Sequence, residues 1–151
     1  MSKKSGFARS STTKRSRRCS RSSVRRKREC RPTGLGGSYA LKAAATGRFE
    51  RAVAFYGLVR TLPVWTGGGQ RDALDSLAAA CPTLAIFGEV DPYTPPADVE
   101  AVRNAWAGRP DHKVVVYPGA DHAFAHDPDR PVHRPDDAAD AWRRAIEFLR
   151  G

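Results

Sequence analysis

The sequence has few cysteines and no long apolar segment. Its 151 residues include three Cys, at positions 19, 30 and 81, and no C-x-x-C pair. An odd count without paired spacing excludes a disulfide scaffold and a zinc finger. No run approaches the roughly 18 apolar residues of a membrane-spanning helix, and no apolar core of a signal peptide follows the basic start. We therefore expect no membrane partner and a cytoplasmic location.

Acidic residues are nearly missing from the first 33 positions. This segment holds 13 Lys and Arg against a single acid, Glu29, which gives a net charge of +12. Residues 34–151 hold 13 basic and 15 acidic residues, so the net charge of +10 belongs to the N-terminal segment. The segment also has eight Ser and almost no large apolar side chain, so burial cannot offset the entropy of ordering it. We expect residues 1–33 to form a disordered, basic tail.

The tail allows three interpretations. It binds nucleic acid or another anionic surface through its charge, it is an organellar targeting segment, or it has no evolved function. Phe7 is its only aromatic residue, so it lacks the stacking side chains of a single-strand binder. No amphipathic apolar stripe runs through it, which weakens the targeting interpretation. A non-enzymatic protein that binds nucleic acid through this tail is the alternative to the function developed below.

From Gly34 onward, apolar segments alternate with amphipathic ones. The pattern predicts helices over 38–48, 72–80, 96–107 and 135–150 and strands over 51–57, 83–87 and 113–117. The strand segments are apolar throughout, which is typical of parallel strands covered by helices on both faces. The expected fold class is α/β, with about three parallel strands and flanking helices.

Two loops that follow predicted strands carry titratable groups. Gly88-Glu89-Val90-Asp91 comes after the second strand, and Gly119-Ala120-Asp121-His122 comes after the third. Reactive residues of open α/β sheets lie in such loops, because the carboxyl ends of parallel strands meet at one edge. Taken singly, Asp91 is an ordinary loop aspartate and His122 a hydrogen-bonded loop histidine. Together they have the Asp-then-His order of an α/β-hydrolase triad.

Such a triad also needs a nucleophile on a sharp turn between a strand and a helix. The corresponding place is Pro32-Thr33-Gly34-Leu35-Gly36-Gly37, directly before the Ala-rich helix. Gly34 stands where Ser or Cys is needed. Cys30 is not a substitute, since four residues of extended chain span more than about 10 Å.

Several segments after Gly34 resemble the C-terminal half of dienelactone hydrolase family proteins. They are LGGSYALKAAATG, RAVAFYG, CPTLAIFGEVDPYTPP, VVVYPGADHAF and DAADAWRRAIEFLR. The resemblance implies a partial α/β-hydrolase fold over residues 34–151. It also implies hydrolysis of a small-molecule carboxylic ester or lactone through an acyl-enzyme formed on a cysteine.

The resemblance assigns roles to four positions. Asp91 and His122 are the acid and the base, Gly34 holds the position of the missing nucleophile, and the amide of Leu35 is one oxyanion donor. The family's substrate-binding Arg is not carried over, because His126 occupies its position. No cofactor and no metal is implied. His126, Asp127 and Asp129 are read as solvated loop residues rather than metal ligands.

The resemblance begins almost where the basic tail ends. The family's apolar strand before the nucleophile is replaced here by the charged residues 24–31. We expect a truncated and inactive form, with residues 1–33 fused from another reading frame or a wrong start. Translation of the upstream DNA in the other two frames tests this hypothesis. It fails if no apolar strand followed by a G-F-C pattern appears.

Overall fold

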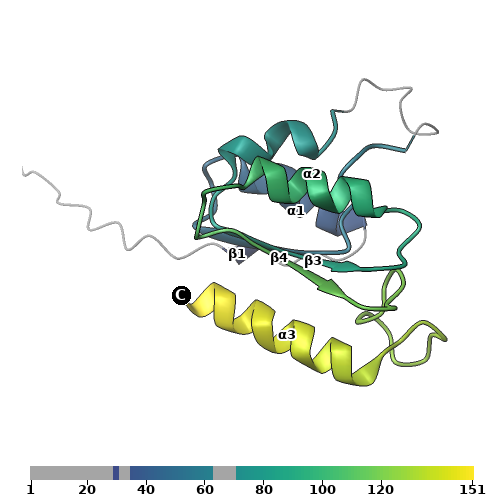
Figure 1. Cartoon of the computed structure of the whole chain (residues 1–151). Coiled ribbons are helices and arrows are strands. Elements are labelled where there is room, and N and C mark those ends of the chain that lie inside the picture. Colours follow the sequence, from purple (N-terminus) through teal and green to yellow (C-terminus); the bar gives the residue numbers. More distant parts are fainter. Residues whose placement is uncertain (1–28, 31–34, 63–70) are drawn as a thin grey trace, which may run out of the picture.

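Four parallel strands form one sheet at the centre of the molecule (Figure 1). The computed structural model describes residues 29–30, 35–62 and 71–151. The strands are β1 (Glu29–Cys30), β2 (Arg51–Phe55), β3 (Thr83–Gly88) and β4 (Lys113–Tyr117), and they lie in this order. Every neighbouring pair is parallel. The expected α/β class with parallel strands and flanking helices is therefore confirmed.

Strand β1 lies inside the segment expected to be a disordered tail. Its two residues pair with Arg51 and Ala52 at the start of β2. A two-residue strand amid basic residues has no hydrophobic pattern, so only the backbone pairing reveals it. The rest of residues 1–33 lies outside the described residues, and the expectations about the tail stay predictions.

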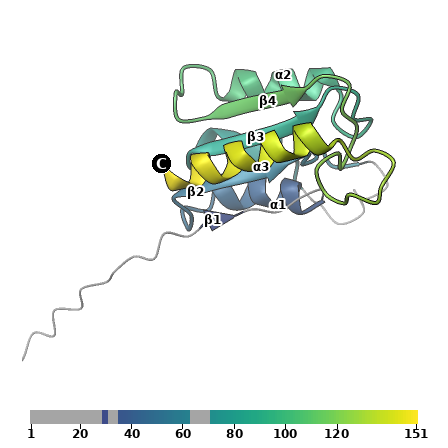
Figure 2. The ribbon, with the colours of Figure 1, turned by 90° about the horizontal axis from the view of Figure 1, so that it is seen from below.

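Helices cover both faces of the sheet (Figures 1 and 2). One face carries α1 (Leu35–Ala44), the 3₁₀ helix η2 (Leu74–Ala79) and α2 (Pro96–Ala105), and the other carries α3 (Pro135–Arg150). The segment predicted as helix over 72–80 is thus a shorter 3₁₀ helix. In the described part of the chain, no helix is both long enough and apolar enough to cross a membrane.

Side chains on the two faces of the sheet pack into two separate clusters of the core. Phe55 and Ile86 pack in the cluster under α3, whereas Ala54 and Phe87 pack in the cluster under α1 and α2. All six residues of β3 are buried, because this strand has a neighbour on each side and a helical layer on each face. This explains why the strands read as continuous apolar runs.

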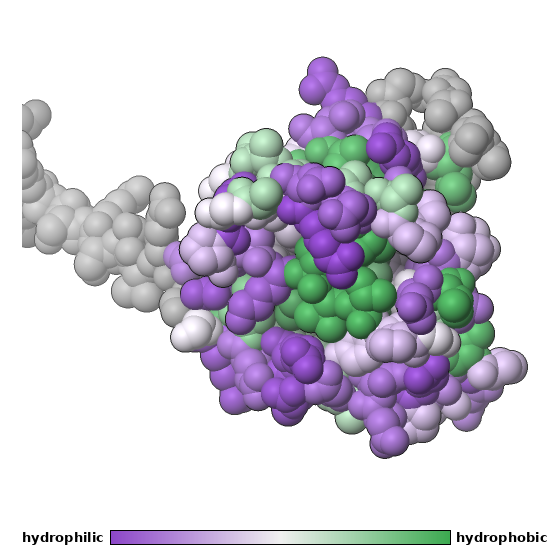
Figure 3. Space-filling view, in the orientation of Figure 1, coloured by the Kyte–Doolittle hydropathy of each residue, from purple (hydrophilic) through white to green (hydrophobic). Residues whose placement is uncertain are grey.

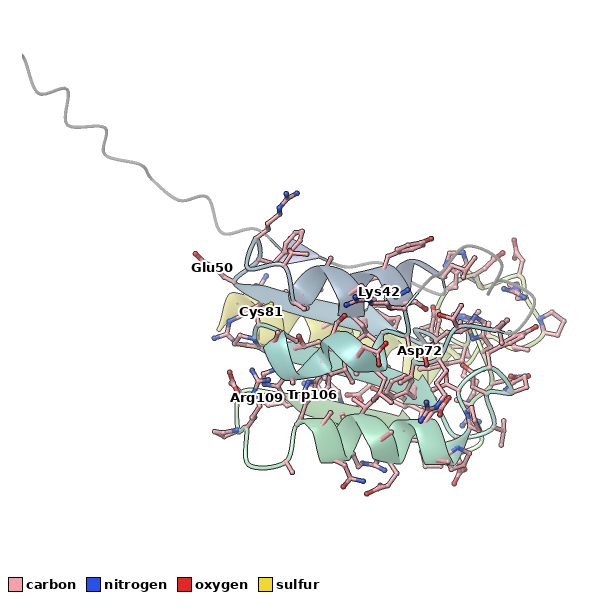
Figure 4. All side chains as sticks on the ribbon, turned by 90° about the horizontal axis from the view of Figure 1, so that it is seen from above. Lys42, Glu50, Asp72, Cys81, Trp106 and Arg109 are labelled. Carbon is pink, nitrogen blue, oxygen red and sulfur yellow. The ribbon has the colours of Figure 1, made fainter. Side chains whose placement is uncertain are left out.

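Two side chains of the segment around the end of α2 hold η2 in place. The indole Nε1 of Trp106 donates a hydrogen bond of 3.1 Å to the carbonyl of Leu77. The guanidinium of Arg109 donates to the carbonyls of Ala78 and Ala80, at 2.9 and 2.8 Å. Trp106 and Arg109 lie side by side in Figure 4. Arg109 thus supplies donors to carbonyls at the end of η2, and Trp106 adds a second donor to the carbonyl of Leu77, which also accepts from the amide of Ala80.

A pair of glycines lets α1 approach the end of β2. A Cβ on Gly37 would lie 2.4 Å from the carbonyl oxygen of Phe55 and 2.8 Å from the Cα of Gly57. No side chain fits in that space, so both positions need glycine. The contact places the first turn of α1 at the carboxyl end of the sheet, next to the loops that carry the candidate site.

Strand β4 forms an edge of the described sheet. Its three valines are only partly buried, and Figure 3 shows a hydrophobic area between the layers of α2 and α3, where this edge lies. Lys113 is exposed at the start of the strand. A charged residue at an edge is one way in which proteins limit strand-to-strand association.

Candidate functional site

The loops after β3 and β4 meet at the carboxyl end of the sheet. Gly88 ends β3, and a Cβ on it would lie 2.3 Å from the carbonyl oxygen of Ala120 in the neighbouring loop. The amide of Val90 donates to that same oxygen at 3.0 Å, and the amide of Glu89 donates to the carbonyl of Tyr117 at 3.0 Å. Backbone hydrogen bonds and a glycine contact thus hold the two loops together.

Asp91 and His122 meet across these loops. The Nδ1 atom of His122 lies 2.8 Å from Oδ2 of Asp91, so the structure brings together the two residues that the sequence singled out. A carboxylate can only accept, so Nδ1 carries the hydrogen of this bond. In the neutral ring, Nε2 is then the basic nitrogen.

The carboxylate of Asp91 is fixed on both oxygens. Its side chain is fully buried, and its Oδ1 accepts a 2.8 Å hydrogen bond from the amide of Tyr93. The side chain of His122 keeps 22% of its surface exposed. A buried acid behind a partly exposed imidazole leaves the outer edge of the ring open to a reactant.

Two tyrosine rings hold the imidazole from its sides. The ring centroid of Tyr56 lies 5.2 Å from that of His122, and the centroid of Tyr93 lies at 5.0 Å, both edge-to-face. Tyr56 adopts a positive φ of 38°, a conformation uncommon for a residue with a side chain. This turn directs Tyr56 away from the line of β2, against the histidine.

The Tyr56 hydroxyl is buried and forms no hydrogen bond with a described residue. Burial raises the pKa of Tyr56 to about 12, and the positive charge of Arg130 opposes this shift in part. The phenol therefore stays neutral at physiological pH.

The start of the His122 loop is anchored to α3 through Tyr117. Its hydroxyl donates a 2.8 Å hydrogen bond to Asp140 on α3. Asp140 also accepts from the guanidinium groups of Arg144 and Arg143. These bonds, with Arg144 contributing most, hold the pKa of Asp140 well below its usual range. Burial and the bond to Asp140 raise the pKa of Tyr117.

The nucleophile side of the site is only partly described. Leu35 is the first residue of α1, and its amide is one of the N–H groups that have no acceptor within a helix. Gly34, at the predicted nucleophile position, lies outside the described residues. His126, Asp127 and Asp129 form no metal-binding group, since no three His, Cys, Asp or Glu side chains gather for a metal in the described segments.

Sequence reasoning missed three residues that shape this site. Tyr56 was counted as part of an apolar strand, Tyr93 was not singled out, and Gly88 was treated only as the end of a strand. No periodic pattern reveals which ring packs on a histidine 66 residues away along the chain. The glycine directly after a buried strand was the one usable signal, because such positions often allow close backbone approach.

Comparison with known sequences connects this geometry with a family of hydrolases. The sequence profile of the dienelactone hydrolase family matches residues 33–151. A Bradyrhizobium protein named "Probable 2-oxo-3-(5-oxofuran-2-ylidene)propanoate lactonase" is 33% identical over 118 residues, which cover 77% of this chain and 47% of the relative. A Yersinia pestis protein named "Putative carboxymethylenebutenolidase" is 34% identical over 111 residues, or 72% and 40% of the two chains. The chain spans somewhat less than half the length of these curated relatives.

Solved structures of hydrolases also match this chain. The "Crystal Structure of Putative Dienelactone Hydrolase from Klebsiella pneumoniae subsp. pneumoniae MGH 78578" matches with a TM-score of 0.72 and 28% identity, over 80% of this chain and 50% of that one. A monoacylglycerol lipase of Paleococcus ferrophilus matches with a TM-score of 0.61 and 15% identity, over 82% and 68%. The second likeness shows the shared fold alone.

Proposed function

Since this chain belongs to the dienelactone hydrolase family, we propose that its Asp91–His122 pair serves the hydrolysis of carboxylic esters or lactones of small molecules. The observation that carries the proposal is the 2.8 Å contact between Nδ1 of His122 and the buried carboxylate of Asp91. Such a pair is the base and the orienting acid of nucleophile–His–Asp chemistry.

Each group has a defined task in this reaction. Nε2 of His122 takes the proton of the attacking nucleophile and later returns it to the leaving alkoxide. Asp91 keeps the ring in the required tautomer and stabilises the imidazolium that forms. The amide of Leu35, at the start of α1, donates to the oxyanion of the tetrahedral intermediate.

The proposal assigns the acid and the base to Asp91 and His122. The position of the nucleophile is occupied by Gly34, which has no nucleophilic side chain. The family pattern has Cys at that position. We therefore expect the unmodified chain to show no turnover of an activated ester, and we expect Gly34→Cys alone not to restore turnover. His122-dependent turnover by the unmodified chain would contradict this part of the proposal.

Thiol reactivity tests the base directly and needs no turnover. We expect the thiol introduced by Gly34→Cys to react with iodoacetamide about tenfold faster than in the double variant that also carries His122→Ala, because the imidazole increases the thiolate fraction. Peptide mass spectrometry follows the introduced thiol separately from the native cysteines. The control is Tyr39→Cys, at an exposed position of α1, whose alkylation is expected not to depend on His122. Equal rates with and without His122 at position 34 would refute the base role.

A further inference from the structure

A cleft lies at the end of the sheet opposite to the Asp91–His122 pair. Its volume is about 400 Å³, and it lies between the last turns of α3 and the first residues of the strands. Figure 2 shows that α3 ends where β2, β3 and β4 begin. The proposed hydrolase chemistry uses none of the residues that line this cleft.

The lining of the cleft combines an apolar floor with positive charge. Leu84 and Val115 contribute the floor from β3 and β4, and Phe148 of α3 lies beside them. Arg51 lies at the start of β2, and Lys113 lies at the start of β4. Both cations lie over the Phe148 ring, with the guanidinium carbon of Arg51 at 5.4 Å and Nζ of Lys113 at 6.0 Å from its centroid.

Both carboxylate side chains in the lining already have a partner, and the last residue of the lining, Gly151, lies beside the guanidinium of Arg51. Asp111 accepts from the imidazole of His112 at 2.9 Å, and Glu147 pairs with Arg143 at 2.9 Å. The two other arginines of the lining are likewise engaged, since both Arg143 and Arg144 bond to Asp140. This ion-pair network is complete without a ligand.

Arg51 and Lys113 differ from that network. Among the described residues, no carboxylate lies within ion-pair distance of either one. Arg51 is held in place by donating a 3.2 Å hydrogen bond to the backbone carbonyl of Phe148. No other hydrogen bond of its guanidinium is made to a described residue, so its remaining N–H groups can bind an anion in the bidentate manner of arginine.

We propose that this cleft binds an organic anion, a carboxylate carried on an aromatic body. The carboxylate binds to Arg51 and Lys113, and the aromatic body lies on Leu84, Val115 and the edge of the Phe148 ring. A purely inorganic anion satisfies the charges but leaves the apolar floor open to water, whereas a neutral aromatic covers the floor and leaves the charges unpaired. Affinity therefore requires both parts in one molecule.

Benzoate is the probe for this site. Titration of the full-length, ¹⁵N-labelled chain with sodium benzoate is expected to give saturable shifts of the backbone amides of Arg51, Lys113 and Phe148. Benzamide has the same ring without the charge, and acetate has the charge without the ring. We expect each to bind at least about tenfold more weakly than benzoate. Phenyl phosphate in a parallel titration shows whether the site prefers a carboxylate or a phosphate head group.

Charge-removing variants locate the binding. Arg51→Gln and Lys113→Gln are each expected to weaken benzoate at least about tenfold. The controls are Arg48→Gln, an exposed arginine on the loop before β2, and Lys42→Gln, a lysine that lies 6.0 Å from the ring of Tyr39 on the opposite helical layer. Neither control is expected to change the affinity. Thermal denaturation checks that each variant is folded.

The proposal is overturned if benzoate causes no saturable shifts in the unmodified chain, or if benzamide binds as tightly as benzoate. It is equally overturned if the two controls weaken binding as much as the two cleft variants do. The first two outcomes need no variant, so they decide the question even if Arg51→Gln fails to fold. Loss of this site leaves the proposed hydrolase function untouched, because the two are read out at opposite ends of the sheet.

Discussion

Two parts of the carboxyl edge of the sheet differ in their hydrogen bonds and in their exposure. The loops after β3 and β4 are joined by backbone hydrogen bonds and a glycine contact, and they hold Asp91 against His122 at 2.8 Å. The start of α1, at the same edge, presents Leu35 with half of its surface exposed, and the buried hydroxyl of Ser38 has no partner among the described residues. The loops that hold Asp91 against His122 thus lie within the described residues, whereas Gly34, the predicted nucleophile position, lies outside them.

The side-chain contacts of the Asp–His pair come from a short part of the chain, and α3 supports the start of the His122 loop through Tyr117 and Asp140. The geometry of the pair depends on two neighbouring strands, their two loops and the rings of Tyr56 and Tyr93. Every one of these contacts is made by residues 56–124. The four predictions below test the contacts that hold this part of the sheet edge, beginning with the largest expected effect.

Gly88→Ala should have the largest effect. The added Cβ would meet the backbone of Ala120 at 2.3 Å, so the two loops must move apart. We expect a loss of about 3 kcal/mol in the free energy of unfolding, measured by urea denaturation. Gly47→Ala is the control. It has a φ of +69° but open space around the added atom, so it should cost only about 1 kcal/mol. Equal losses in the two variants would refute the close-approach explanation.

Asp91→Asn should alter the histidine ring more than the fold. The amide side chain no longer offers a charged acceptor to Nδ1, so the ring loses the preference for its Nδ1–H tautomer. We expect the ¹⁵N resonances of the His122 ring to change and the stability to fall by about 1 kcal/mol. Asp121→Asn is the matched control, because Asp121 accepts from the backbone amide of His122 and not from its ring. If both variants change the ring equally, the pair is not specific.

Asp140→Asn should reduce the acid sensitivity of the fold. The pKa of Asp140 is lowered in the folded chain, so its contribution to stability is present above the usual carboxyl pKa and is lost as the pH falls below it. The variant should therefore unfold less steeply between about pH 4 and pH 2. Asp136→Asn is the control that removes a carboxylate elsewhere on the same helix. A pH profile unchanged by Asp140→Asn would exclude this support of the β4 end.

Tyr56→Phe should have the smallest effect at neutral pH. The hydroxyl that it removes is buried and has no partner in the described part of the chain, so little stability is lost. At high pH the two proteins should differ. The pKa of Tyr56 is raised to about 12, so in the native chain its contribution is complete below the usual value of 10.0 and is lost as the pH rises from there. We expect the variant to lose less stability over that interval, whereas Tyr39→Phe at an exposed position should not differ from the native chain. Equal losses of stability in the native chain and in Tyr56→Phe over that interval would contradict the raised pKa of Tyr56.

The order of the helices and strands could be predicted closely, because strong hydrophobic patterns mark most of them. The strand Lys113–Tyr117 and the helix Pro135–Arg150 have the predicted bounds. Strand β1 was missed because its two residues stand among charged neighbours, and only pairing with β2 makes them a strand. The 3₁₀ form of η2 was missed because its shape depends on Trp106 and Arg109, some 30 residues later in the chain.

The candidate site could be predicted in its chemistry but not in its surroundings. Asp91 and His122 were found from their order after successive strands, and the structure places them in contact. The roles of Tyr56 and Tyr93 depend on ring positions that arise only when three loops meet. The cleft at the opposite end was not predicted either, since its charges come from β2 and β4, and its aromatic ring comes from the last turns of α3.

The sequence by itself determined the parallel α/β class, the family and the Asp–His pair, because local hydrophobic patterns and short motifs carry that information. It also located the excess positive charge in residues 1–33. The tertiary structure alone decided which side chains surround His122 and which cations remain unpaired at the other end of the sheet. Those outcomes depend on contacts between residues far apart in the chain, and such contacts leave no periodic signal in the sequence.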